Sequence, residues 1–212
     1  MLMSCQELLQ HTLLFDIEVN ERNEIYSLGA VLHEKTFQVY NKRITPHILA
    51  EFDEFSAEAQ YLLGHNILKH DLPRLQQAAP SLQIFTKPKI DTLFLSPLAF
   101  PANPYHRLVK NYQIVRDSIN DPVQDAALAG KVFTEQWEAL VKQFGADADV
   151  ALLYRAFLAS DSSLIGTAEV MGYMGIPLLT GDDVLETFSW FARKHCCVTA
   201  VDHIVLQLID EQ

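Results

Sequence analysis

Four carboxylates in the first 130 residues have spacings from which they could hold metal ions. Asp16 and Glu18 stand two apart in the apolar run TLLFDIEV, so on a strand both would point to one face. Asp71 follows GHNILKH at the start of an expected helix, and Asp125 lies in the first turn of a later one. Hard oxygen ligands favour Mg²⁺ or Mn²⁺ over zinc, and four could hold two ions about 4 Å apart for in-line attack on a phosphodiester.

Each of these acids also has a simpler role when it is taken alone. Asp16 and Glu18 could lie in water on an edge strand, and Asp71 and Asp125 could interact with the positive end of a helix dipole. Two carboxylates on one face of a central strand, however, are costly unless a cation neutralises them. The full set of four therefore favours a metal site.

Alternating strands and helices must position these acids. Apolar, β-prone runs predict strands at 12–19, 24–32, 36–40, 61–64 and 89–93, with helices over 48–60 and after Asp71. The first three strands are joined too closely to be anything but antiparallel partners. We therefore predict an α/β fold with a mixed sheet, antiparallel hairpin strands plus parallel strands, flanked by helices.

The remainder of the chain has a helical pattern. Asp121, Pro122 and Gln124 form a helix start, with Asp at the N-cap, Pro at the first helical position and Gln at the third. Further helices are expected over 150–159, 164–174, 184–194 and 201–209, and their apolar residues, Trp190 and Phe191 among them, are expected in helix packing more than on a partner surface. We predict a domain over residues 1–145 and a helical extension over 146–212.

Composition excludes several classes of protein. The chain has 212 residues and a net charge of -11, which excludes attachment to nucleic acid mainly through a global basic surface, but not a nuclease that uses a local patch or metal ions. Three cysteines are too few for a disulfide framework and indicate a reducing, cytoplasmic compartment. No stretch approaches the roughly 18 apolar residues of a membrane span, so no membrane association is expected.

Three segments carry a family resemblance. FDIEVN, GHNILKHDLPRL and NDPVQDA, in this order, resemble the three motifs of the DEDD (DnaQ-like) 3′-to-5′ exonucleases, which include the proofreading subunit of bacterial DNA polymerase, ribonuclease T and oligoribonuclease. The EVN of the first segment and the HNILKHDLPRL of the second are similar to the exonuclease domain at the start of some large bacterial RecQ-like helicases. The resemblance covers about residues 10–135, and residues 136–212 carry no motif of the family core.

The resemblance implies an RNase H-like fold and removal of nucleotides from the 3′ end of single-stranded DNA, with RNA as another substrate and a helicase domain or helicase as partner. It also implies two Mg²⁺ or Mn²⁺ ions. Asp16 would bridge both ions, Glu18 and Asp125 would complete the site of the ion that activates water, and Asp71 would serve the second ion through water. Asn66 would match the family's HN element and brace the site.

The third motif departs from the family pattern. The family's general base is a His five residues before the last Asp or a Tyr four before it, and these positions hold Asn120 and Asp121. Asn is not a useful base near pH 7. His106 could take the role, Asp121 could serve as base instead of capping its helix, water activated by the metal ions could suffice, or the motif could be aligned with a shift.

Two other functions are the alternatives to this exonuclease. One is a weakly active or inactive module that binds single strands or a helicase partner, and the other is a short-RNA exonuclease.

A locally basic segment is the predicted strand-binding surface. Residues 87–116 carry five Lys and Arg against one Asp, interleaved with aromatic residues that could stack bases. Arg107 and Lys110 lie one helical turn apart, beside Tyr105, and could follow successive phosphates. Core aromatics with solvated charges are the alternative. His70, where the family commonly has an aromatic residue, could contact the strand or pack behind the site.

Overall fold

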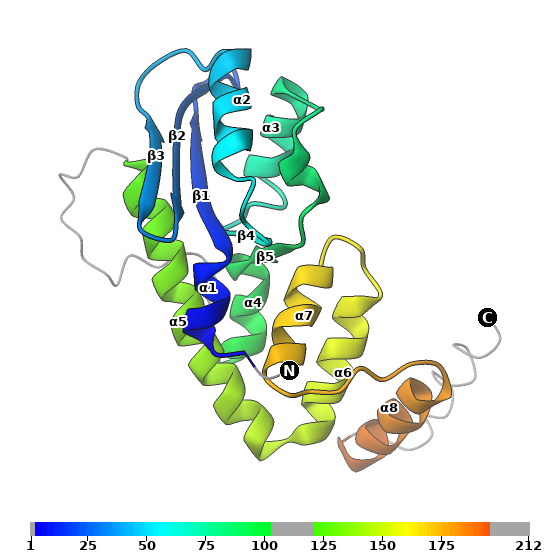
Figure 1. Cartoon of the computed structure of the whole chain (residues 1–212). Helices are drawn as coiled ribbons and strands as arrows, with labels where there is room; N and C mark the ends of the chain where they lie inside the picture. Colours follow the sequence, from blue (N-terminus) through cyan, green and yellow to red (C-terminus); the bar gives the residue numbers. More distant parts are fainter. Residues whose placement is uncertain (1–2, 103–120, 196–212) are drawn as a thin grey trace. The chain divides into compact units, whose positions relative to one another are not determined.

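The computed structural model describes residues 3–102 and 121–195 (Figure 1). The chain divides into two compact units, one over residues 3–141 and one from Lys142 onward. The division falls inside the long helix α5 (Pro122–Ala146). All four predicted carboxylates therefore belong to the first unit.

The first unit is built on a five-stranded mixed sheet, as predicted. The strands, in the order β3-β2-β1-β4-β5 across the sheet, are β1 (Thr12–Val19), β2 (Ile25–Leu32), β3 (Lys35–Val39), β4 (Tyr61–Gly64) and β5 (Lys89–Asp91). The pairs β1–β2 and β2–β3 are antiparallel, whereas β1–β4 and β4–β5 are parallel. Because β1 is central and Asp16 and Glu18 are only partly exposed, the alternative of an edge strand with both acids in water is wrong.

Alternation along β1 separates the core face from the acidic face. Leu13, Phe15 and Ile17 are buried in the main hydrophobic cluster. Helices α2 (Pro46–Phe55) and α3 (Asp71–Ala78) cover this face and contribute Phe52 and Leu75 to the same cluster. The opposite face, which carries Leu14, Asp16 and Glu18, lies against α5. Because Leu13, Phe15 and Ile17 are buried on one face of β1, the two carboxylates on the other face point toward α5.

Some elements of the first unit differ from the prediction. Helix α2 ends at Phe55 instead of residue 60, because the Ser56 hydroxyl donates to the Asp53 carbonyl oxygen and competes with the helical hydrogen bond. Strand β5 ends at Asp91, whose carboxylate caps an unpredicted helix, α4 (Thr92–Ala99). A second unpredicted helix, α1 (Cys5–Gln10), begins at a capping box formed by Ser4 and Glu7. A 3₁₀ turn spans Gln83–Thr86.

The second unit is helical, as predicted for the C-terminal part. Beyond the end of α5 it contains α6 (Ala148–Ala159), α7 (Ile165–Tyr173) and α8 (Asp182–His195), and α6 contacts both of the others. Asp147 caps α6 by accepting a hydrogen bond from the Val150 amide. The helix expected over 201–209 lies outside the described residues. None of the helices in the described ranges is both long and apolar enough to cross a membrane.

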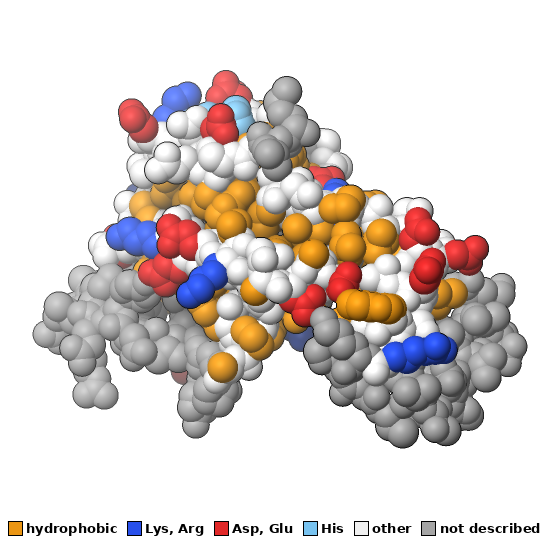
Figure 2. Space-filling view, turned by 90° about the horizontal axis from the view of Figure 1, so that it is seen from below, with side chains coloured by type: hydrophobic (Ala, Val, Ile, Leu, Met, Phe, Trp, Pro, Cys, Tyr) orange, Lys and Arg blue, Asp and Glu red, His pale blue; other side chains and the backbone are white. Residues whose placement is uncertain are grey.

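Part of the surface is apolar. Figure 2 shows apolar side chains on the face in view, with charged side chains of both signs beside them. In the second unit, Trp190 is 52% exposed, and Phe157 and Leu178 are exposed as well. The expectation that Trp190 packs in the core is therefore wrong, whereas Phe191 is partly buried.

Candidate metal centre

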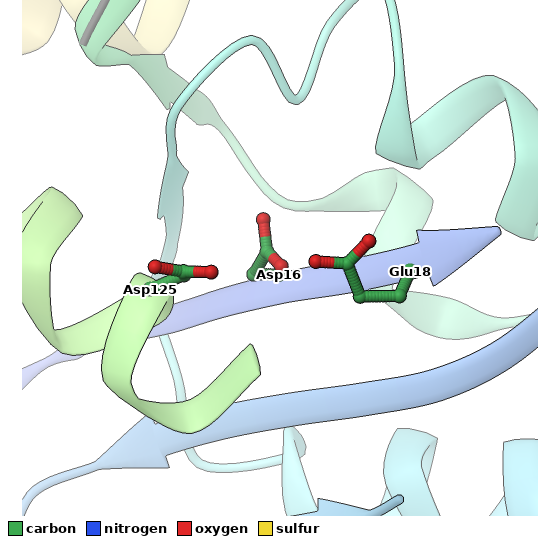
Figure 3. A group of neighbouring side chains, drawn as sticks. All are labelled: Asp16, Glu18 and Asp125. Carbon is green, nitrogen blue, oxygen red and sulfur yellow. The ribbon is translucent and has the colours of Figure 1, made fainter. Parts of the chain in front are cut away.

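Three of the four predicted carboxylates meet at one point. One carboxylate oxygen each from Asp16, Glu18 and Asp125 lies within 4.8 Å of the other two. Figure 3 shows the two β1 side chains and the α5 side chain pointing toward one another. Asp16 and Glu18 are partly buried and Asp125 is exposed, so the group opens to solvent on the α5 side. We call these three residues the acidic cluster.

A glycine in β2 allows α5 to come this close. Gly29 is paired with Asp16 across β1 and β2. A Cβ atom built on Gly29 would lie 2.3 Å from the Pro122 carbonyl carbon and 2.3 Å from the Val123 nitrogen. Real Cβ atoms do not approach other atoms this closely. The backbone of α5 therefore rests directly on β2, and Asp125 reaches Asp16 from the first turn of the helix.

Asp121 fixes the start of α5. Its Oδ1 accepts hydrogen bonds from the Val123 amide at 3.0 Å and from Gln38 Nε2 of β3 at 3.1 Å, and its Oδ2 accepts from Gln124 Nε2 at 3.0 Å. The predicted N-cap is therefore confirmed, and the cap also ties the helix to the sheet. A carboxylate with these three donors is not placed to take a proton from water, which argues against Asp121 as general base.

The fourth acid, Asp71, lies beside the cluster. Its carboxylate is 1% exposed, with Oδ1 accepting from the Ile17 amide at 3.0 Å and Oδ2 lying 3.2 Å from His70 Nδ1. Strand β4 pairs with Thr12, Leu13 and Leu14, so the Asp71 side chain supplies the acceptor for Ile17 where that pairing has ended. Asp71 therefore does more than interact with the dipole of α3, because its carboxylate also accepts a hydrogen bond from the backbone of β1.

Burial and neighbouring carboxylates raise the affinity of Asp16 and Glu18 for protons. Burial, together with the charges of Asp71, Asp125 and Glu18, raises the pKa of Asp16 to about 9. Burial and then Asp125 raise the pKa of Glu18, although the nearby His70 counteracts this effect. Burial also raises the pKa of Asp71, against the opposing hydrogen bond with His70. A group of oxygen donors that retains a proton near neutral pH fits a hard divalent cation, which would replace that proton.

A buried acid outside the predicted set holds the loop before Asp71. Asp91 is fully buried and accepts hydrogen bonds from the amides of Asn66, Leu68 and Leu93, at 2.8, 3.0 and 2.9 Å. Asn66 has a positive φ of 67°, which the first of these bonds helps to maintain. The Asn66 backbone amide is thus held by Asp91, and the role of Asn66 in bracing the site stays a prediction. The sequence signal that could have identified Asp91 is its place as the last residue of the short strand KID.

The two histidines of the second motif differ in their surroundings. His65 Nδ1 lies 2.8 Å from Thr92 Oγ1, and burial lowers the pKa of its ring. His65 thus belongs to the packing between β4 and α4. His70 contacts Asp71, has 36% of its side chain exposed, and favours the ionised form of Glu18. His70 therefore lies at the edge of the acidic cluster, where contact with a bound strand stays a prediction.

Part of the predicted strand-binding surface is described. Lys87 Nζ donates to the carbonyl oxygens of Ala57 and Ala59, and Lys89 Nζ donates to that of Phe85, so these two lysines are tied to backbone oxygens. The expectation that they contact phosphates is weakened accordingly. Five predicted site residues lie outside the described residues: Tyr105, Arg107 and Lys110, predicted to bind the strand, and His106 and Asn120, predicted at the catalytic centre.

No protein-family model matches the chain, and no curated protein matches it. The functional inference therefore depends on the chain's own motifs and on the geometry of the acidic cluster.

Proposed function

We propose that this chain is a metal-dependent 3′-to-5′ exonuclease with an RNase H-like fold. It would hydrolyse phosphodiester bonds at the 3′ ends of single-stranded DNA with two Mg²⁺ or Mn²⁺ ions, in association with a helicase domain or helicase. The observation that carries the proposal is the approach of Asp16, Glu18 and Asp125 to within 4.8 Å of one another. The five-stranded mixed sheet and the order of the three motifs support it.

Each of the four acids has a role in the proposed mechanism. Asp16, Glu18 and Asp125 would hold the ions, and Asp71 would act from beside them. When bound, the ions would supply positive charge to the phosphate and to the attacking water. The chain's own contribution is positioning: Asp71 holds β1 at Ile17, and the contact between Gly29 and Pro122 holds Asp125 against β1.

A second candidate function is a nucleic-acid-binding module with little chemistry of its own. The observation that favours it is the engagement of Asp121 in capping α5, because this removes one of the residues that could replace the missing general base. Such a module would guide a single strand to a helicase partner.

A cleavage assay separates the two functions. A 5′-labelled single-stranded DNA 20-mer is incubated with the full chain and Mn²⁺, and an RNA 20-mer competes in a parallel reaction. Stepwise shortening from the 3′ end supports the exonuclease, whereas retention without shortening supports the module. Preferential loss of the RNA would replace DNA with RNA as the substrate.

Two variants test whether cleavage depends on the acidic cluster. Asp16→Asn keeps the shape of the side chain and should lower the rate at least about 100-fold, since ligand charge is lost at the most buried of the three acids. Glu58→Gln changes an exposed acid in the turn after α2 and should leave the rate unchanged. Equal rates for Asp16→Asn and the unmodified chain would refute the metal mechanism.

A further inference from the structure

A second site of opposite charge lies at one end of the sheet. Where β1 turns into β2, a cavity of about 600 Å³ is lined by the turn, by the segment after β3 and by α3. Among the described residues that line it, Glu24 is acidic and four are basic, a net of +3 in a chain whose net charge is -11: Arg22, Lys42, Arg43 and Arg74. We call this site the basic cavity.

The positive charge of the basic cavity is not neutralised within the described part of the chain. Glu24 is engaged by Asn20, whose Nδ2 donates to the Glu24 carboxylate at 2.9 Å. Arg22, Lys42 and Arg43 are exposed, and no ion pair involves them in residues 3–102 and 121–195. Four cations gathered around one hollow repel one another, so the cavity favours an anionic ligand.

Arg74 has spare hydrogen-bonding capacity. Its Nη1 donates to the His70 carbonyl oxygen at 2.8 Å, which fixes the guanidinium against the start of α3. Its Nε is buried and has no hydrogen-bond partner among the described residues. The guanidinium that lines the basic cavity is thus held in place, and arginine binds phosphate through paired N–H groups.

The basic cavity adjoins the acidic cluster through two elements. Asn20, the first residue after β1, follows Glu18 by two residues, about 7 Å along an extended chain. On α3, Arg74 lies one turn after Asp71. Tyr26, which lines the cavity, directly precedes Ser27, the partner of Glu18 across β1 and β2. A ligand that occupies both sites must therefore carry negative charge at intervals along its length.

We propose that the basic cavity binds backbone phosphates of the same strand whose 3′ end lies at the acidic cluster. This inference rests on the proposed function and adds a subsite for the nucleotides upstream of the bond that is cut. Arg22, Lys42, Arg43 and Arg74 would pair with the phosphates, and the volume suits a ligand of nucleotide size. The subsite explains how a strongly acidic protein can retain a polyanion.

Binding without cleavage tests the subsite. The affinity of the full chain for a fluorescein-labelled single-stranded DNA 12-mer is measured in EDTA over a series of KCl concentrations. Arg22→Gln combined with Arg43→Gln should weaken binding at least about tenfold and reduce the salt slope by about 1.4, which is about 0.7 for each lost phosphate contact. Thermal unfolding confirms that the double variant is folded.

A matched pair of lysines controls for net charge. Lys35 begins β3 and Lys42 lies three residues after its end; both are exposed, and only Lys42 lines the basic cavity. Lys42→Gln should reduce the affinity and the slope, whereas Lys35→Gln should change neither. Equal effects of the two substitutions would overturn the subsite, as would the absence of measurable DNA binding by the unmodified chain.

Two further measurements distinguish the subsite from a small-anion site and from the exonuclease activity itself. Pyrophosphate that displaces the 12-mer at equal phosphate concentration would overturn the subsite in favour of a site for small phosphate anions. Unchanged binding by the double variant, with the unmodified chain cutting DNA in Mn²⁺, would overturn the subsite and leave the exonuclease standing. Binding that depends on the cavity, without any cleavage, would support the subsite and contradict the exonuclease.

Discussion

Gly29 lies against the backbone of Pro122 so closely that a methyl group at position 29 would stand 2.3 Å from the Pro122 carbonyl carbon. Gly29 is also the partner of Asp16 across β1 and β2. One contact between backbones therefore sets the separation of Asp16 from Asp125, which comes from a distant part of the sequence.

Gly29→Ala should disrupt the acidic cluster without removing any carboxylate. The new methyl group must push the start of α5 away, which costs about 1–3 kcal/mol and moves Asp125. We expect Mn²⁺ affinity, measured by calorimetry, to fall at least about tenfold. Gly145→Ala is the control, since no atom of the described residues lies within 4 Å of its added methyl group, and it should be neutral or stabilising by up to about 1 kcal/mol. An unchanged Mn²⁺ affinity in Gly29→Ala would contradict the proposed dependence on this contact.

The metal-free protein should lose stability as the pH rises. The pKa of Asp16 is raised to about 9 in the folded protein, above the ordinary value of 3.8, so between these values unfolding releases a proton. The free energy of unfolding then falls by up to about 1.4 kcal/mol per pH unit, and the raised pKa values of Glu18 and Asp71 act in the same direction. Urea unfolding in EDTA between pH 5 and 8 measures the slope. Asp16→Asn should make it shallower, and Glu58→Gln should not.

Metal binding should release protons. At pH 7 the raised pKa leaves Asp16 protonated, so a bound cation must displace about one proton. Calorimetric Mn²⁺ titrations in two buffers with different ionisation enthalpies count the protons, and the apparent affinity should rise up to about tenfold per pH unit from pH 6 to 8. In Asp16→Asn the release should largely disappear. A pH-independent Mn²⁺ affinity of the unmodified chain would show that Asp16 is not a ligand.

Two substitutions of Asp71 should separate its structural role from its charge. An amide oxygen in Asp71→Asn can still accept from the Ile17 amide, so the stability should change by less than about 1 kcal/mol while cleavage slows. Asp71→Ala leaves the Ile17 donor unpaired and should cost about 1–3 kcal/mol more, measured by urea unfolding. Full cleavage activity in Asp71→Asn would limit Asp71 to its structural role.

Asp91→Ala should destabilise the loop that precedes Asp71. The substitution removes the acceptor of the Asn66, Leu68 and Leu93 amides, and we expect a loss on the order of 3 kcal/mol in urea unfolding. Proteolysis should begin in the loop, and mass spectrometry identifies the first cut. A loss below about 0.5 kcal/mol would mean that water satisfies these donors.

Local patterns predicted much of the fold. The alternation of apolar and acidic residues in TLLFDIEV predicted β1 with its observed bounds and placed Asp16 and Glu18 on one face. Asp121 and Pro122 predicted the start of α5. Helix α4 was missed because its apolar sequence TLFLSPLA contains Pro97 and continues directly from a strand.

What the sequence determined by itself is which residues share a face and where elements begin, because alternation and capping depend on neighbours a few positions apart. Only the tertiary structure decided that Asp125 joins Asp16 and Glu18, that Asp71 bonds to Ile17, and that Asp91 holds the loop. The basic cavity, whose cations come from three separate segments, belongs to the same category. These relationships depend on the close approach of distant backbones, which packing sets and local spacing does not encode.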